Sequence, residues 1–375
     1  MTNAATDLSQ TLGFSGSYPA HEVRFLLNIL QMQPTNIEEK EQLIQSGKKH
    51  YSSMLSAEHP PSATHLQHYD LAMQLGAARM AKEVQQLGNR LLELYAPEPI
   101  VLVSLVRAGV PLGVLLRDYL AAQVPCYHYG VSIIRDRGID HAALDQIIRL
   151  HGAKNIVFVD GWTGKGAITR ELSRSLQDYP ELWDTQSGLP RLLVLSDLAG
   201  CAWLAASQDD WLIPSGVLGS VISGLISRSV LPEHAQQGTW HGCIQYHTLA
   251  EHDLSNSFIQ QIRSHIQQQP EQQSCLWGNT QRQQQQQQSQ QTIDWLMQHY
   301  RVEQVNHIKP SIAEATRAVL RRVPERILLK DADHPSTQLL RHFAEQQQVA
   351  IDVLGEQLGP YQAVTLIKTM PKDCS

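Results

Sequence analysis

Apolar runs alternate with amphipathic stretches through the middle of the chain. Four runs are typical of strands buried on both faces of a parallel sheet, at residues 100–106, 124–134, 156–160 and 191–197. Apolar positions at helical spacing follow each run and predict helices near residues 110–122, 141–150, 167–178 and 199–207. This alternation predicts an α/β fold, in which a parallel sheet carries helices on both faces.

Two further folded regions flank this pattern. Residues 1–98 have apolar positions at helical spacing and predict a helical amino-terminal extension capping the sheet domain, with helices over 20–31, 37–55 and 69–95. Residues 292–375 predict a small α/β module, with strands over 326–330, 349–354 and 363–367 and a helix over 336–348. The sheet domain between these regions is expected to span residues 99–270.

Residues 271–291 are rich in glutamine and include an unbroken glutamine run from 283 to 288. Such a run buries little apolar surface, which predicts a disordered linker between two domains.

The third apolar run ends in a carboxylate and a glycine-rich turn. Asp160 follows the predicted strand, at the sheet edge where open α/β folds bind ligands. Glycines in the turn permit close approach of an anion to the N–H groups of the next helix. The turn predicts a phosphate and ribose cradle, and it comprises Gly161, Trp162, Thr163, Gly164, Lys165, Gly166 and Ala167. A strand-to-helix turn that binds nothing is the open alternative.

A second turn of this kind follows the first apolar run. It contains Arg107, Ala108 and Gly109, and Pro111 lies close to the start of the following helix. A guanidinium group and backbone amides suit a diphosphate. Two anion-binding turns on one sheet can hold the two phosphate ends of a single ligand.

The two turns together resemble the type I phosphoribosyltransferases. The Arg107-Ala-Gly109-Val-Pro111-Leu segment is similar to the pyrophosphate-binding turn of that family. Residues 156–167 resemble its signature for the ribose and 5′-phosphate, although Gly161 stands where the family has a second acid. More narrowly, nearly the whole chain resembles phosphoribosyltransferase-like proteins of bacterial tellurium-resistance and stress gene clusters, which also carry the name StiP cysteine proteases.

The resemblance implies a phosphoribosyltransferase that uses phosphoribosyl pyrophosphate, with Mg²⁺ bound through that ligand. Arg107 would hold the leaving diphosphate, Asp160 would orient the ribose, and residues 161–167 would hold the 5′-phosphate. Arg135 and Arg137 occupy the place of the family's mobile hood and would close over the site, and an exposed charged turn is the open alternative. The acceptor, an unknown base or nucleoside precursor, cannot be identified from the sequence.

The carboxyl-terminal module resembles Pelota-like RNA-binding domains. Its basic residues are close in sequence and could form a local patch for RNA phosphates, namely Arg317, Arg321, Arg322, Arg326, Lys330 and Arg341. Ordinary surface arginines are the alternative. The formal net charge is −6, so the protein as a whole has no positive field that would attract RNA. Any RNA contact within residues 292–372 must therefore come from a local basic patch.

Two rival functions stay open. A cysteine hydrolase could use Cys126 near His128, or Cys243 near His241, because a thiol nucleophile needs a nearby base. A non-catalytic sensor could read a nucleotide in the same pocket and pass the signal to the RNA module. The start of the chain lacks the pattern of a signal peptide and no apolar run reaches membrane-spanning length, which predicts a cytoplasmic protein with no membrane partner. The sequence leaves open whether it forms a homo-oligomer.

Overall fold

A computed structural model describes residues 12–232 and 238–370 of the chain. Its larger part is built on a seven-stranded sheet with the strand order β1-β4-β3-β7-β11-β12, and β8 pairs with β11. Every pairing in this sheet is parallel. The predicted α/β fold with a parallel sheet is therefore confirmed.

The strands of this sheet are β1 (Arg24–Phe25), β3 (Ile100–Leu105), β4 (Cys126–Val131), β7 (Ile156–Val159), β8 (Trp162–Thr163), β11 (Leu192–Asp197) and β12 (Leu204–Ser207). The main helices around it are α3 (Ala63–Tyr95), α4 (Val110–Ala121), α5 (His141–His151), α6 (Ala167–Ser175) and α8 (Ser255–Gln268). Shorter elements of the same part are β2 (Asn28–Ile29), β5 (Ile133–Ile134), β6 (Gly138–Ile139), β9 (Trp183–Asp184), β10 (Leu189–Pro190), β13 (Gly242–Cys243) and α7 (Pro214–Val217).

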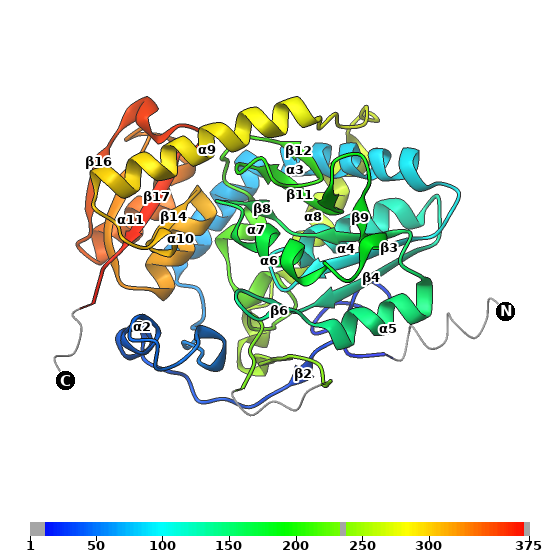
Figure 1. Ribbon diagram of the computed structural model, residues 1–375, viewed down its shortest axis with the longest axis horizontal. Coiled ribbons are helices and arrows are strands. Elements are labelled where there is room, and N and C mark those ends of the chain that lie inside the picture. The colour runs from blue at the N-terminus through cyan, green and yellow to red at the C-terminus, as the bar shows by residue number, and fades with distance from the viewer. Residues whose placement is uncertain (1–11, 233–237, 371–375) are drawn as a thin grey trace.

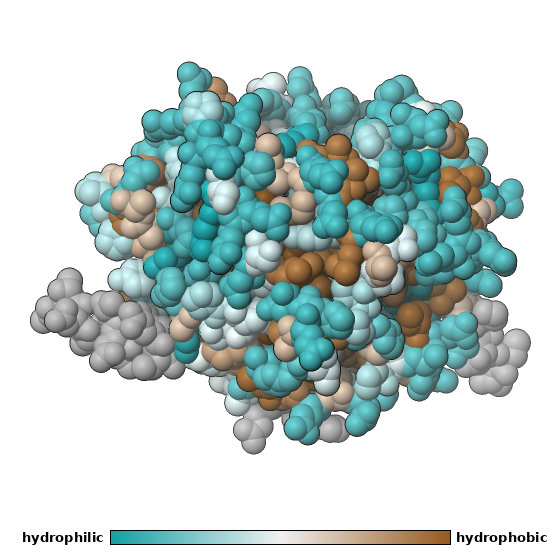
Figure 2. Space-filling model, turned by 180° about the vertical axis from the view of Figure 1, so that it is seen from behind, coloured by the Kyte–Doolittle hydropathy of each residue, from teal (hydrophilic) through white to brown (hydrophobic). Residues whose placement is uncertain are grey.

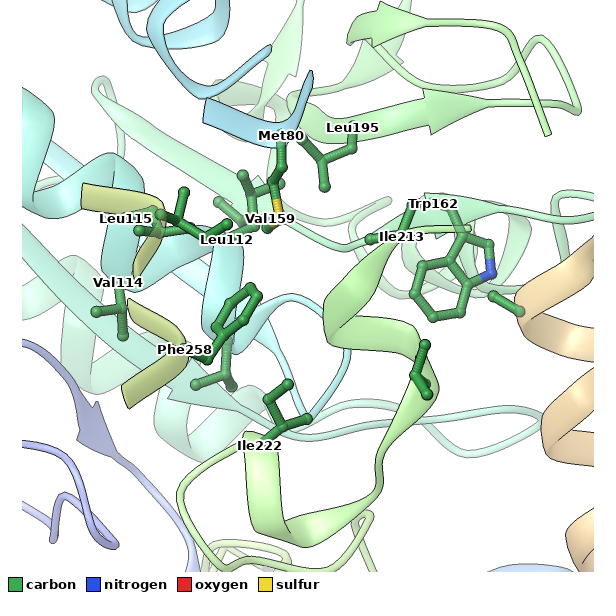
Figure 3. Close-up of a cluster of buried hydrophobic side chains, with 14 of the residues drawn as sticks. Met80, Leu112, Val114, Leu115, Val159, Trp162, Leu195, Ile213, Ile222 and Phe258 are labelled. Carbon is green, nitrogen blue, oxygen red and sulfur yellow. The ribbon is translucent and has the colours of Figure 1, made fainter. Parts of the chain in front are cut away.

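Both faces of the sheet are buried under helices. One face carries α3, α4 and α8, whose side chains, such as Met80, Leu115 and Phe258, pack against Val159 and Leu195 of the strands (Figure 3). The opposite face carries α5 and α6 over a second apolar cluster. Burial on both faces explains why the strands read as continuous apolar runs rather than as alternating ones.

The amino-terminal region is only partly helical. Helix α2 (Ile37–Gln45) covers only the first part of the helix predicted over residues 37–55, which ends in a 3-10 turn, η1 (Tyr51–Ser53). Helix α3 covers the helix predicted over residues 69–95 and begins earlier, at Ala63. The helix predicted over residues 20–31 is wrong, because this segment forms β1 and β2 instead. The spacing of its apolar residues fits a short helix. In so short a run, however, the spacing of apolar residues alone does not distinguish a helix from a strand.

The helix predicted over residues 199–207 is also wrong. After β11, the Asp197 carboxylate accepts hydrogen bonds from the N–H groups of Cys201 and Ala202, at 3.1 and 2.7 Å. These bonds hold the following residues in a loop, and the chain then pairs as β12 in parallel with β11. A local carboxylate–backbone contact thus competes successfully with helix formation.

The carboxyl-terminal module is a mixed four-stranded sheet with two helices. Its strand order is β14-β17-β15-β16, and only the β15–β16 pairing is parallel. The elements are β14 (Ile308–Pro310), α10 (Ile312–Arg321), β15 (Pro324–Leu329), α11 (Gln338–Gln346), β16 (Ala350–Val353) and β17 (Ala363–Ile367). Three of these strands and α11 agree with the predictions, while β14 and α10 were not predicted.

The glutamine-rich segment is a helix rather than a disordered linker. Helix α9 (Asn279–His299) contains the whole glutamine run and extends along one side of the molecule into the carboxyl-terminal module (Figure 1). Gln285 donates to the Leu198 carbonyl at 3.1 Å, and Ser289 lies 2.6 Å from the Tyr361 hydroxyl. Glutamine is a good helix former, and these contacts with both domains add the stabilisation that the run itself lacks.

The surface seen from behind is mainly hydrophilic, with apolar residues gathered near its middle (Figure 2). Among the described residues, no helix has both the length and the apolar character needed to span a membrane.

Candidate functional site

A cavity of about 200 Å³ lies where the larger sheet meets helix α10 of the carboxyl-terminal module. It brings together both predicted anion-binding turns, because the carboxyl ends of β3 and β7 are adjacent in the sheet. We call it the interdomain cavity. The predicted site residues that line it are Arg107, Ala108, Asp160, Trp162, Thr163, Gly164, Lys165, Gly166 and Ala167.

Gly109 and Gly161 let the two turns approach each other. A Cβ atom on Gly109 would lie 2.0 Å from the Val159 carbonyl oxygen, and one on Gly161 would lie 3.2 Å from the Ala108 carbonyl oxygen. A larger residue at position 109 therefore collides with backbone. These glycines are needed for the close packing of the turns, whether or not an anion binds there.

Arg107 is almost fully buried and already has partners within the protein. Its Nη1 donates to the Ile226 carbonyl at 2.8 Å, and its Nη2 lies 2.7 Å from the carboxylate of Glu58. Glu58 comes from the loop before α3, which no sequence motif marks. The guanidinium that was expected to hold a diphosphate is therefore bound to an internal carboxylate.

Asp160 borders the cavity with a perturbed pKa. Burial raises the pKa of Asp160 to about 7, while the hydrogen bond from the Gly161 N–H, at 2.8 Å, acts in the opposite direction. Near neutral pH this carboxyl group is therefore divided between its neutral and charged forms.

The turn at residues 161–167 packs against the carboxyl-terminal module. The Tyr361 hydroxyl donates to the Gly164 carbonyl at 3.0 Å, and the Lys165 ammonium donates to the Ile308 carbonyl. A Cβ atom on Gly164 would lie 3.1 Å from the Glu314 carboxylate. Polar groups of the predicted phosphate cradle thus form part of the contact between the larger sheet domain and the carboxyl-terminal module.

Two arginines of the expected RNA patch face this cavity instead of a free surface. Arg317 lies over the Trp162 ring, 4.6 Å from its centroid, and Arg321 lies 3.5 Å from the Glu58 carboxylate. Trp162 itself lies at the edge of the sheet core, next to the ribbon of the carboxyl-terminal module (Figure 3).

The other residues of that expected patch are dispersed and paired. Arg322 binds Glu41 of α2, and Arg326 binds Asp352 at 2.8 Å. Lys330 and Arg341 lie near carboxylates of their own module, Glu356 and Asp333 respectively. Closeness in sequence did not become closeness in space, because the residues lie in or directly after α10, β15 and α11 and pair with separate carboxylates.

The two arginines of the predicted hood line a different cavity. Arg135 and Arg137 border a space of about 570 Å³ between the amino-terminal region and the carboxyl-terminal module. We call it the basic cavity, and its other charged or aromatic lining residues include Lys48, Lys49, His50, Tyr51, Asp136, His307 and Arg322. The structure therefore does not bring Arg135 and Arg137 together with Arg107 and Asp160 in one pocket.

Cys126 and His128 line one groove of about 520 Å³ at the start of β4, together with the exposed His21. His128 Nδ1 lies 2.8 Å from the Glu22 carbonyl oxygen, and its Nε2 lies 2.7 Å from the Ser104 hydroxyl. A carbonyl can only accept, so Nδ1 carries the hydrogen. Nε2 faces the Ser104 hydroxyl, whose oxygen also lies 3.0 Å from the Gly109 carbonyl oxygen. Both ring nitrogens of His128 are therefore occupied.

The second predicted pair is less suited to catalysis. Burial raises the pKa of both predicted thiols to about 12, but Cys243 is fully buried whereas Cys126 borders a groove. His241 Nδ1 lies 2.7 Å from the Ser132 hydroxyl rather than beside this thiol. Of the remaining thiols, Cys201 is half-buried and donates to Thr169 at 3.2 Å, Cys275 is buried, and Cys374 lies outside the described residues.

No group of three or more His, Cys, Asp or Glu side chains within residues 12–232 and 238–370 could hold a metal ion. The Mg²⁺ expected from the sequence was to be bound through a diphosphate ligand, so this observation does not test it. It stays a prediction.

The fold and these sites define an α/β protein with a parallel sheet, a small carboxyl-terminal domain and mostly buried thiols. The StiP model, described as a tellurite-like stress resistance cysteine protease, matches residues 16–263, and the PELOTA RNA binding domain model matches residues 287–369. A protein of Acinetobacter baylyi named cysteine protease StiP is 54% identical over 385 residues, covering 98% of each chain. The chain belongs to the StiP family.

These comparisons correct the predicted activity. The family and the Acinetobacter baylyi protein are both named cysteine proteases, which are hydrolases, so the expectation of a phosphoribosyltransferase using phosphoribosyl pyrophosphate is wrong. The geometry is compatible with this correction, since Arg107 is paired with Glu58 and the glycine-rich turn is packed against another domain. The expected resemblance to StiP proteins and to Pelota-like domains is confirmed.

Proposed function

We propose that this protein is a cysteine protease in which Cys126 is the nucleophile and His21 is the base. The observation that carries the assignment is the groove at the start of β4, which is lined by both a thiol and a free-standing imidazole at the surface. His128, whose two ring nitrogens are engaged, would position the strand rather than take part in proton transfer.

The groove follows a sheet edge that can receive an extended peptide. β1 pairs with β4 only at Tyr129 and Gly130, so no described strand covers the edge at Cys126. The Gly130 carbonyl accepts from Leu26 on that side. Because hydrogen-bonding groups alternate along a strand, the main-chain groups of Cys126 point the same way. A substrate strand added there would lie beside the thiol.

The thiol is protonated in this arrangement, since burial raises the pKa of Cys126 to about 12. Attack on a peptide carbonyl then requires transfer of the thiol proton to His21 as the bond from Sγ to the carbonyl carbon forms. The proton passes to the leaving amine when the peptide bond breaks, and water hydrolyses the resulting thioester to regenerate the thiol.

Hydrolysis of fluorescein-labelled casein by the full chain tests the assignment. Cys126→Ser is expected to lower the rate at least about a hundredfold, and His21→Gln is expected to lower it by a similar factor. Cys201→Ser and Cys243→Ser are the matched controls and should retain most of the activity.

Loss of hydrolysis with Cys243→Ser or Cys201→Ser, and retention with Cys126→Ser, would move the nucleophile to another thiol. Hydrolysis that survives replacement of all five cysteines by serine would rule out a cysteine protease.

RNA binding is a second candidate function, carried by the PELOTA match and by the basic cavity. This cavity joins His307 and Arg322 of the carboxyl-terminal part to Lys49 and Arg137, with Tyr51 among its walls. Cations interleaved with an aromatic ring are suited to a single-stranded backbone with stacked bases. RNA would therefore contact three regions of the chain rather than the carboxyl-terminal module alone.

We expect the protein to act in the cytoplasm.

Fluorescence anisotropy with a labelled oligouridine tests this candidate. The double variant Lys49→Gln/Arg137→Gln is expected to weaken binding and to reduce the salt slope by about 0.7 for each lost phosphate contact. Lys154→Gln, an exposed lysine away from this cavity, is the control. Salt-independent binding, or equal binding by all variants, would contradict a role for the basic cavity.

A further inference from the structure

The groove beside Cys126 is lined by cationic side chains and by no opposing carboxylate. Arg117 of α4 and Arg24 of β1 border it, together with the exposed His21. None of the described residues that line this space is an aspartate or a glutamate. A ligand that enters the groove therefore meets positive charge next to the thiol.

Arg117 shares its counter-ion with another arginine. Its Nη1 lies 3.3 Å from the Asp118 carboxylate, and its Nε is buried without a hydrogen-bond partner. Arg263 also binds Asp118, donating from Nε at 2.6 Å, and its Nη2 lies 2.6 Å from the Glu22 carboxylate. The two carboxylates therefore balance Arg117 and Arg263 and leave no negative charge for a third cation.

Arg24 is a third cation at this groove, and no carboxylate of the described residues pairs with it. Its Nε donates to the Leu12 carbonyl at 2.9 Å, and its Nη2 donates to the Gly13 carbonyl. Carbonyl oxygens accept hydrogen bonds but carry no full charge that would cancel the charge of a guanidinium group. The groove therefore keeps one positive charge in excess.

Arg117 acts electrostatically on the groups at the centre of the groove. Burial raises the pKa of Cys126 to about 12, and the Arg117 guanidinium acts in the opposite direction. Burial lowers the pKa of His128 to about 4, and Arg117 adds to this effect. Because Arg117 and Cys126 line the same groove, a substrate group bound by Arg117 would belong to a residue close to the scissile bond.

We propose that the groove selects peptides with aspartate or glutamate next to the scissile bond, and that Arg117 binds the substrate carboxylate. The proposal rests on the proposed cysteine protease and names its class of substrate. A guanidinium group can donate two parallel hydrogen bonds to one carboxylate, and the buried Nε of Arg117 has no other partner. The bound carboxylate would also supply the negative charge that the lining lacks.

The selection must be local to the groove. The formal net charge of −6 repels an acidic peptide from the molecule as a whole, so general attraction does not favour it. A peptide strand added to a sheet edge gains affinity from its main chain and specificity from the sites that receive its side chains. A basic side chain at the same position would meet Arg24 and Arg117, and this repulsion adds to the selectivity.

Fluorescence anisotropy with the full chain tests recognition without hydrolysis. The probes are two fluorescein-labelled nonapeptides, one of alternating alanine and glutamate and one of alternating alanine and glutamine. The Cys126→Ser variant lacks the proposed nucleophile and is expected to bind the glutamate peptide about tenfold more tightly than the glutamine peptide. Adding Arg117→Gln should remove this preference. Adding Arg149→Gln is the matched control and should preserve it, because Arg149 is exposed on α5 and donates to Gln146.

Hydrolysis of the same peptides separates binding from chemistry. In chains that retain Cys126, Arg117→Gln is expected to raise KM for the glutamate peptide about tenfold with little change in kcat, and to leave the glutamine peptide unaffected. Arg117→Lys keeps the charge and should restore part of the loss. A purely structural role of Arg117 would change the kinetics of both peptides alike.

Equal binding of the two peptides by Cys126→Ser, or a preference that survives Arg117→Gln, would overturn the proposal. Thermal unfolding verifies the fold of each variant, and if Arg117→Gln unfolds, the comparison of Arg117→Lys with Cys126→Ser alone decides. A glutamate peptide that is bound through Arg117 but never hydrolysed would contradict the protease assignment and leave the recognition standing. Hydrolysis of both peptides with the same KM would contradict the recognition alone.

Discussion

At the scale of single residues, chemistry here is governed by burial. The Cys126 thiol and the Asp160 carboxyl group both have raised pKa values because water is excluded around them. Glu58 is also mostly enclosed, but two arginines more than compensate for the loss of water. Residue type alone therefore says little about charge state in this protein, whereas neighbours and solvent access decide it.

Asp160→Asn should alter the pH dependence of stability. The native carboxyl group holds its proton up to a pKa of about 7, while the unfolded chain releases it near the ordinary value of 3.8. Wild-type stability therefore gains a contribution from this group at low pH, which is lost as the pH rises from about 4 to 7. Asparagine keeps the acceptor for Gly161 and removes this dependence.

Urea unfolding at several pH values measures the effect. We expect the stability of the variant relative to the wild type to increase between pH 4 and 7. Above pH 7 the variant should be about 2 kcal/mol more stable after allowing for solvent screening. A difference that does not change with pH would show that the Asp160 pKa is not raised.

At the scale of elements, contacts with neighbours override local composition. Helix α9 consists largely of glutamine, yet it is held in place by its packing on the loop after β11. Gly200 in that loop has a φ of +61°, and a Cβ atom there would lie 2.2 Å from the Arg282 carbonyl oxygen of α9. The loop and the helix thus meet backbone to backbone.

Gly200→Ala should loosen α9. The added methyl group must push the helix backbone away, and the positive φ adds strain, so we expect a loss of about 3 kcal/mol in the free energy of unfolding. Gly355→Ala is the matched control, since Gly355 has a φ of +59° but open space around its Cβ position.

The control isolates backbone strain and should cost about 1 kcal/mol. Equal losses in the two variants, measured by urea unfolding, would mean that the contact with α9 contributes nothing.

At the scale of the whole molecule, charged groups join regions that are distant in sequence. Glu41 of α2 is fully buried and pairs with Arg322, which follows α10, with one N–O distance of 2.7 Å. Gln45, one turn further along α2, donates to the Lys368 carbonyl at 2.9 Å. The amino-terminal region therefore binds the carboxyl-terminal module directly, and the basic cavity lies beside this junction.

Glu41→Gln should weaken this junction. Removing one partner of a buried ion pair leaves the other charge uncompensated, so we expect a loss of about 3 kcal/mol in the free energy of unfolding. Glu39→Gln, at an exposed position of the same helix, should change it by less than about 0.5 kcal/mol. Urea midpoints give both values, and similar losses in the two variants would contradict the role of the Glu41–Arg322 pair.

The repeating apolar pattern was sufficient to predict the large sheet and the helices on its two faces. Each of these strands is buried on both sides, so a continuous apolar run, such as Ile156–Val159, marks it in the sequence. The predictions over residues 20–31 and 199–207 failed where a short apolar segment fits a helix or a strand equally well. Tertiary partners, β4 in one case and β11 in the other, decided between them.

The sequence by itself determined the α/β architecture, the position of the two glycine-containing turns and the family of the protein, because these depend on local runs and motifs. Only the tertiary structure decided what those turns contact. Arg317 and Arg321 carry no motif, yet they line one cavity with Arg107, and Glu58 from the loop before α3 pairs with Arg107 and Arg321. Electrostatic interactions act through space rather than along the chain, so the chemical state of the turn that contains Arg107 follows from the packing of the two domains.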